Sequence, residues 1–177
     1  MSEKERSDVV DKLVDAYEHM LKRIHDALEP EEKETIPSFR ELLHRARDHM
    51  VELGELTREE AHKVAEYLER DIEDAAGYIA ETGEDLKSWW RFDLGLMEQR
   101  MLEVFSQVAD QTSIQLCSLA EQARRASLYH TGEVTGPGVL VCDSCGAEVH
   151  MPRTGRIPLC PKCHATDFKR ISETEVH

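Results

Sequence analysis

The sequence has few aromatic residues, no long apolar run and far fewer basic than acidic residues. Phe, Trp and Tyr make up 6% of the 177 residues, whereas 33% are charged. This composition favours long amphipathic helices over a compact, sheet-rich core. No apolar run approaches the roughly 18 residues of a membrane span, so no membrane association is expected. Nothing at the N-terminus resembles a secretion signal, and we expect a soluble, cytoplasmic protein with reduced thiols.

The acidic charge is concentrated in the first part of the chain. Residues 1–130 contain 17 Lys and Arg against 30 Asp and Glu, a net charge of −13, whereas residues 131–177 contain 5 against 6. Such a surface repels nucleic acid and anionic membranes and favours basic partners. The chain length allows one ordinary domain and a small second one.

Apolar residues recur at steps of three and four over most of this acidic part, which predicts helices. The first helix is expected over about residues 5–29. Two Ser/Thr-x-x-Glu capping boxes mark the next two starts, Ser38 with Glu41 and Thr57 with Glu60. Because only a short loop around Gly54 separates these two helices, they are expected to form an antiparallel hairpin that ends near Gly83.

A further helix is expected from about Asp85 to Tyr129, with a possible bend near Gly95. Its apolar stripe continues for about ten turns and outruns a single small core. We therefore expect part of it to meet a second copy of the protein, giving a homo-oligomer through the helical domain. The alternative is that Trp89, Trp90 and Phe92 simply cover the end of the hairpin. Cys117 is interpreted as a small buried hydrophobe.

The run of Gly, Pro and Thr at residues 131–138 breaks the helical pattern and marks a domain boundary. The expected organisation is an acidic helical domain at 1–130, a linker at 131–138 and a small β module at 139–177. Short apolar runs at 139–141, 147–151, 156–159 and 167–171 suit an antiparallel sheet. Its expected core is Val139, Val141, Val149, Ile157, Leu159 and Phe168. The predicted fold class is mainly α with a small β module, as an antiparallel long-helix bundle or coiled-coil hairpin followed by a zinc ribbon.

Two Cys-x-x-Cys pairs, separated by fourteen residues, carry the strongest motif of the sequence. Four thiolates from two tight turns are typical of a tetrahedral structural zinc site. We therefore expect one Zn²⁺ per chain, with the ligands Cys142, Cys145, Cys160 and Cys163. Two disulfides are the alternative. Gly146 allows the first turn a positive φ, and His164 stands where glycine would be easier in the second. Whether His150 or His164 ever replaces a sulfur stays open.

A closed four-thiolate site does no chemistry, so catalysis has to be sought elsewhere. The pattern Glu-x-x-His, which carboxylate-bridged di-iron bundles use, occurs as Glu41 with His44 and as Glu59 with His62. Both pairs fall on the polar side of their helices and are expected to face solvent. The sequence contains no phosphate-binding glycine loop, nucleophile elbow or zinc-protease motif. No enzyme is expected.

Two other classes of function are considered. Arg153, Arg156, Lys162, Lys169 and Arg170 offer contacts to nucleic acid, but the ribbon is nearly neutral and lacks an aromatic platform for bases. A helical bundle with a two-pair cysteine tail is also the layout of rubrerythrin, an iron protein. The lack of inward-facing pairs of metal ligands in the bundle argues against a rubrerythrin. Thiolates bind both zinc and iron, so the cysteines alone do not exclude iron.

Four short motifs distinguish the sequence: Gly-Glu-Leu-Thr-Arg at 54–58, Tyr-His-Thr-Gly-Glu-Val at 129–134, Leu-Val-Cys at 140–142 and Leu-Cys-Pro-Lys-Cys at 159–163. By these motifs, and over roughly residues 10–171, the chain resembles a family of bacterial zinc-ribbon-containing proteins that has no assigned activity. The resemblance implies a helical N-terminal domain and a C-terminal zinc ribbon, and no catalytic residue. The leading hypothesis is a non-enzymatic, zinc-binding adaptor protein, with an unidentified protein partner.

Overall fold

A computed structural model of the chain describes residues 3–28, 37–86, 99–116 and 128–170. The helices are α1 (Glu3–Leu28), α2 (Phe39–Glu52), α3 (Arg58–Thr82) and α5 (Gln99–Leu116). The strands are β1 (Leu128–His130), β2 (Val134–Thr135), β3 (Gly138–Cys142), β4 (Glu148–Met151), β5 (Gly155–Arg156) and β6 (Asp167–Arg170). The prediction of a mainly helical chain with a small C-terminal β module is confirmed. No helix of the described residues is long and apolar enough to cross a membrane.

Both predicted capping boxes are present. The Glu41 N–H donates to Ser38 Oγ at 3.3 Å, and the Ser38 N–H donates to the Glu41 carboxylate at 3.1 Å. The same reciprocal pair joins Thr57 and Glu60. These bonds satisfy N–H groups that the first turn of a helix leaves unpaired, so the starts of α2 and α3 are set locally.

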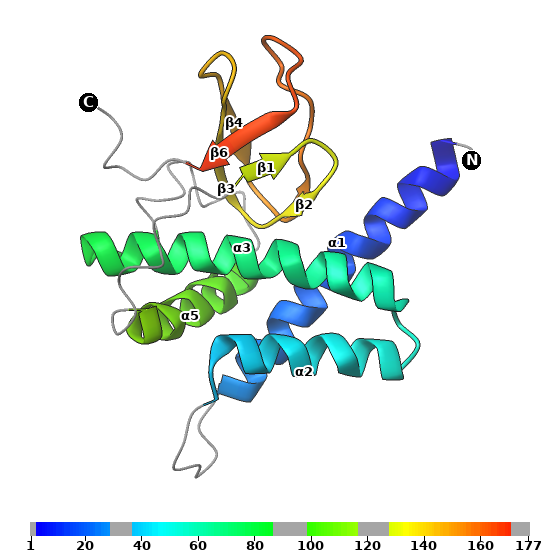
Figure 1. Cartoon of the computed structure of the whole chain (residues 1–177), viewed down its shortest axis with the longest axis vertical. Coiled ribbons are helices and arrows are strands. Elements are labelled where there is room, and N and C mark those ends of the chain that lie inside the picture. Colours follow the sequence, from blue (N-terminus) through cyan, green and yellow to red (C-terminus); the bar gives the residue numbers. More distant parts are fainter. Residues whose placement is uncertain (1–2, 29–36, 87–98, 117–127, 171–177) are drawn as a thin grey trace.

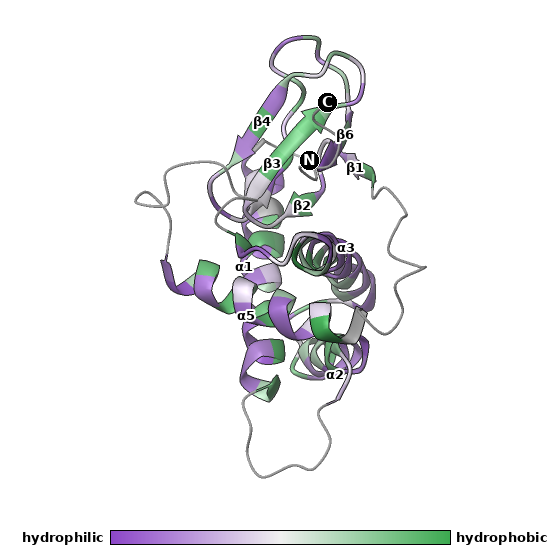
Figure 2. Ribbon diagram, turned by 90° about the vertical axis from the view of Figure 1, so that its left-hand side faces the viewer, coloured by the Kyte–Doolittle hydropathy of each residue, from purple (hydrophilic) through white to green (hydrophobic). Residues whose placement is uncertain are grey.

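The helices bury one common apolar core. In Figure 1, α2 and α5 lie on one side of α3 and the sheet lies on the other. Figure 2 shows the apolar residues gathered where the helices face one another. The largest fully buried side chains of this core are Tyr17, Met20, Leu21, Ile24, Leu43, Met50, Leu68, Ile72, Leu86 and Phe105. At the start of α1 the apolar stripe of the helix does not reach this core, because Val9 is 43% exposed.

The long helix expected over residues 85–129 is not confirmed. Its described part is α5, and Tyr129 lies in strand β1, opposite Phe168 of β6. Strand pairing therefore overrides the helical pattern at this end. Val104, Phe105 and Val108 of the predicted stripe are buried within the chain's own core. Gly95, the residues at 89–92 and Cys117 lie outside the described residues.

The β module contains a four-stranded antiparallel sheet in the order β1-β6-β3-β4 and a two-stranded sheet of β2 and β5. The four expected strands correspond to β3, β4, β5 and β6, whereas β1 and β2 were not expected. Of the predicted core residues, Val149, Ile157 and Phe168 lie in the ribbon core, whereas Leu159 is 49% exposed and Val141 is only partly buried. Val139 is buried but outside this cluster, and the neighbouring Leu140 occupies the core instead. Cys160, the neighbour of Leu159, is fully buried instead.

Residues 131–138, expected as a linker, contain β2 and the first residue of β3. Val134 of β2 is buried in the helical core. The backbone of this segment also passes very close to the helices at Gly136. A Cβ placed on Gly136 would lie 2.8 Å from Tyr17 Oη and 3.0 Å from Phe105 Cε2. The β module is therefore packed directly against the helices at this point.

We predict that Gly136→Ala destabilises the protein by about 1–3 kcal/mol, because both neighbouring side chains are fully buried and have to move. Urea unfolding followed by circular dichroism measures the loss. Gly155→Ala is the matched control, since its Cβ would meet Met151 Cε at an ordinary 3.5 Å. Equal stability of the two variants would contradict the close approach.

Candidate metal centre

Two knuckles bring the four predicted cysteine ligands together. The first knuckle runs from Cys142, the last residue of β3, to Ala147. The second runs from Cys160 to Ala165, just before β6. The four Sγ atoms all lie within 4.8 Å of one another, with Cys142 and Cys163 at 3.5 Å and Cys145 and Cys160 at 3.6 Å. These separations exceed the 2.05 Å of a disulfide, and all four thiols are free. Zn–S bonds of about 2.3 Å in a tetrahedron require sulfurs about 3.8 Å apart. The donor set and its spacing therefore fit one tetrahedral ion.

The two knuckles repeat the same backbone hydrogen bonds. In the first, the Cys142 N–H donates to Ala147 O and the Gly146 N–H donates to Cys142 O, both at 2.9 Å. In the second, the Cys160 N–H donates to Ala165 O and the His164 N–H donates to Cys160 O, at 3.0 and 2.9 Å. Each pair of bonds fixes a turn that points two sulfurs at one place.

Gly146 and His164 hold the same position in these turns, with φ values of 71° and 60°. The predicted left-handed conformation at both is therefore confirmed. His164 is the only non-glycine residue with positive φ in the described part of the chain. Histidine tolerates this region better than branched residues do.

We predict that His164→Val weakens metal binding and lowers the stability of the ribbon by about 1–2 kcal/mol, because a β-branched residue is strained at positive φ. His164→Gly is expected to retain both properties. Competition with a chromophoric chelator measures the affinity. His150→Val is the control, since His150 lies exposed in strand β4, where a branched residue is suitable. Loss of binding in His164→Gly would instead indicate a role for the imidazole.

Backbone amides act to lower the pKa of both cysteines of the second knuckle, but the net shifts of the two thiols are opposite. Hydrogen bonds from the N–H groups of Cys163 and Lys162 lower the pKa of Cys160 to about 6, against the opposing effect of burial. The Ala165 N–H acts to lower the pKa of Cys163, but its sulfur neighbours and loss of hydration outweigh this and raise it to about 12. One sulfur is thus readily a thiolate while another retains its proton. A divalent cation would replace the remaining protons.

The site has a closed side and an open side. Cys142 and Cys160 are buried, Cys145 is partly buried and Cys163 is exposed. Neither His150 nor His164 belongs to the cysteine group. His150 instead faces Glu148, with Nε2 and Oε2 3.4 Å apart. The described ligand set is therefore four sulfurs, of which Cys163 is the most exposed.

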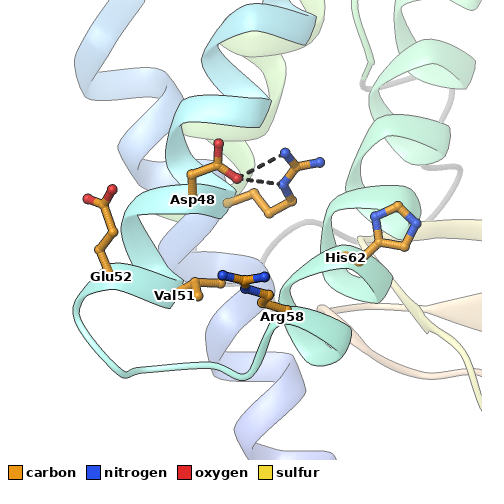
Figure 3. Close-up of a pocket in the computed structure, with 6 residues that line it drawn as sticks. Asp48, Val51, Glu52, Arg58 and His62 are labelled. Atoms are coloured by element: carbon orange, nitrogen blue, oxygen red, sulfur yellow. Dashed lines mark hydrogen bonds and ion pairs between the residues drawn. The ribbon is translucent and has the colours of Figure 1, made fainter.

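The two Glu-x-x-His pairs do not form a second metal centre. Glu41, His44, Glu59 and His62 are all exposed, as predicted from the helical pattern. His62 instead lines an open hollow of about 450 Å³ between the ends of α2 and α3. Figure 3 shows the side chains that line this hollow. Arg47 Nε donates to Asp48 Oδ1 at 2.9 Å. The lining of this hollow carries charges of both signs.

The basic residues of the ribbon are divided between its surface and its interior. The Arg170 side chain is only 3% exposed, so this expected contact is wrong. Lys169 forms an ion pair of 2.6 Å with Asp143. Arg153, Arg156 and Lys162 remain exposed. Burial of Arg170 follows from its place on β6, on the side of the sheet that faces the helices.

Sequence reasoning missed the polar cluster to which Arg170 belongs. Its centre is Asp71 of α3, which is fully buried. Tyr17, Tyr129 and Thr135 complete the cluster, and they come from α1, β1 and β2. The available signal was the place of Asp71 three residues after Leu68 and four before Ala75, on the edge of an apolar face. A carboxylate there needs buried partners.

The fold and the site together define a helical protein that carries a zinc ribbon with four convergent cysteines. The chain belongs to the family described as "Zinc-ribbon containing domain", whose model matches residues 26–172. This confirms the resemblance noted from the sequence motifs. The chain is also similar to the uncharacterised protein YbeL of Escherichia coli K12 and of Escherichia coli O157:H7. Each is 28% identical over 130 residues, which cover 73% of this chain and 79% of YbeL. No solved structure matches the chain.

Proposed function

We propose that the protein is a non-enzymatic interaction protein whose ribbon is held by one structural Zn²⁺. The observation that carries the proposal is the four-sulfur site itself. Four cysteines occupy all positions of a tetrahedral ion and leave none for a substrate. Such an ion contributes folding energy and keeps the surface of the ribbon in one shape.

The family description and the exposed Glu-x-x-His pairs favour zinc over iron as the bound metal. The family is described as zinc-ribbon containing. The Glu-x-x-His pairs that a di-iron bundle would require face solvent. Elemental analysis of the purified protein is expected to give one zinc per chain in a colourless sample. A coloured preparation with stoichiometric iron would overturn this assignment.

The acidic helical surface supports the docking role. Residues 1–130 carry a net charge of −13, and such a surface favours a basic partner at low ionic strength. Single apolar side chains are also exposed near the C-terminal ends of α2 and α5, including Leu53 and Ile114. We expect the helices to bind a partner protein or a second copy, and the ribbon to provide a second recognition surface.

Light scattering over a concentration series, together with pull-down at two salt concentrations, tests this role. A mass of two or more chains supports self-association, and a salt-sensitive, stoichiometric partner with a basic surface supports docking. A monomer without any such partner would contradict both. Binding of RNA or DNA by the full chain at low salt would favour the nucleic-acid function instead.

A further inference from the structure

The most unusual feature outside the metal site is the buried charge between the helices and the ribbon. The Asp71 carboxylate is fully buried and accepts hydrogen bonds from both sides of this boundary. Tyr17 Oη of α1 donates to it at 2.5 Å, and the Gly136 N–H donates at 2.6 Å. Thr135 Oγ1 lies 3.0 Å from each carboxylate oxygen. One helical carboxylate thus organises the segment that leads into the ribbon.

Arg170 of β6 supplies the opposite charge. Its Nη2 lies 3.5 Å from Asp71 Oδ1 and donates to Thr135 Oγ1 at 2.5 Å. The Nε atom donates to Tyr129 Oη at 2.9 Å, and the Tyr129 hydroxyl donates to Asp74 of α3. The guanidinium also donates to the carbonyls of Gly136 and Pro137 at 3.2 Å. The hydrogen bonds of Arg170 thus hold β1, β2 and the segment after β2 together, and its ion pair with Asp71, with the bond from Tyr129 to Asp74, joins this assembly to α3.

Their surroundings keep the Tyr17 phenol and the Arg170 guanidinium protonated. Burial, helped by Asp71, raises the pKa of Tyr17 well above its usual value, so the phenol stays a donor. Burial acts to lower the pKa of Arg170, but the electrostatic effects of Tyr129, Asp71 and Asp74 outweigh it. The guanidinium stays charged. Removal of Asp71 would leave Arg170 buried without this carboxylate, and removal of Arg170 would leave Asp71 with Arg70 alone.

The strand that carries Arg170 is tied to the metal site. Strand β6 pairs with β3, so that Cys142 lies opposite Phe168 and Leu140 lies opposite Arg170. Cys142 ends β3, and Cys163 lies shortly before β6. A bound ion would join these two cysteines and so hold the two strands in register. Without it, the ribbon has only a small core to keep β6 in place.

We infer that metal binding by the ribbon is coupled to the stability of the helices through the contact between Arg170 and Asp71. The inference rests on the proposed metal site and goes beyond it. Loss of the ion releases β6, and Asp71 then remains inside the helical core with Arg70 of its own helix but without the guanidinium of the ribbon. Because coupling is reciprocal, a change at Asp71 must also weaken metal binding, although Asp71 is not a ligand.

The wild-type full chain gives the first test. Amide hydrogen exchange is measured with one equivalent of zinc and after chelation, with elemental analysis of both samples. Chelation is expected to speed exchange around residues 71–76 of α3 by at least tenfold, which corresponds to about 1.4 kcal/mol. Unchanged exchange in a chain that had bound and lost zinc would overturn the coupling. A chain that never binds metal would instead refute the proposed function.

The variant Asp71→Asn gives the second test. We expect its zinc affinity, measured by competition with a chromophoric chelator, to fall about tenfold while helicity is retained. Glu66→Gln is the matched control, because Glu66 lies exposed on the same helix, and its affinity is expected to equal that of the wild type. Equal affinities for all three proteins would overturn the inference. If Asp71→Asn does not fold, the wild-type exchange experiment decides.

Discussion

Replacement of Cys160 by serine is expected to abolish stoichiometric metal binding and to unfold the ribbon, while the helices stay folded with lower stability. Eight buried residues form the ribbon core of the described chain, and two of them are Cys142 and Cys160. A structural zinc ion contributes about 10–16 kcal/mol to the folding of small zinc modules. A core of this size cannot replace that contribution. Elemental analysis, and amide exchange of β3, β4 and β6, measure the two losses.

Ser144→Ala is the matched control for this substitution. Ser144 lies exposed between two of the cysteines, and its replacement is expected to leave one metal ion per chain. Cys145→Ser is expected to behave like Cys160→Ser. Retention of a folded ribbon in a metal-free cysteine variant would show that the four sulfurs do not hold the module. Complete loss of helicity would show that the helices cannot fold without the ribbon.

The metal site could be predicted from the sequence because its determinants are local. Each knuckle is specified by two cysteines three residues apart and by a following residue that accepts positive φ. The capping boxes at Ser38 and Thr57 were equally readable, since a capping box needs only four consecutive residues. Local motifs of this kind carry their own geometry, and the folded chain reproduces them.

The contact between the ribbon and the helices could not be predicted in the same way. Arg170 was assigned to the surface, since arginine is almost never fully buried unless it is paired. Its partner Asp71 lies about a hundred residues earlier in the chain, and no local pattern joins the two. Tyr129 likewise completes a helical stripe in the sequence, yet it pairs with Phe168 in the sheet. Both errors arose where tertiary contacts override local periodicity.

Arg170→Gln is expected to lower the free energy of unfolding by about 3–5 kcal/mol, because it removes one of the two cations that pair with the buried Asp71 carboxylate and leaves the other acceptors of its guanidinium unpaired. Arg70, whose Nε lies 3.4 Å from Asp71 Oδ1, compensates only in part, since its other donors are directed to Glu133 and the Val134 carbonyl. Urea unfolding of the metal-loaded protein, followed by circular dichroism, measures the effect.

Arg40→Gln is the control for this charge. Arg40 also pairs with two carboxylates of α3, Glu69 and Glu73, but its side chain is 66% exposed. Its loss is expected to cost less than about 1 kcal/mol, because exposed ion pairs contribute little. The double variant of Arg170→Gln and Asp71→Asn should be more stable than the sum of the single losses predicts, by about 1–3 kcal/mol. Strict additivity would mean that Arg170 and Asp71 act independently, and the ribbon would then be held on the helices by apolar packing around Val134 and Gly136.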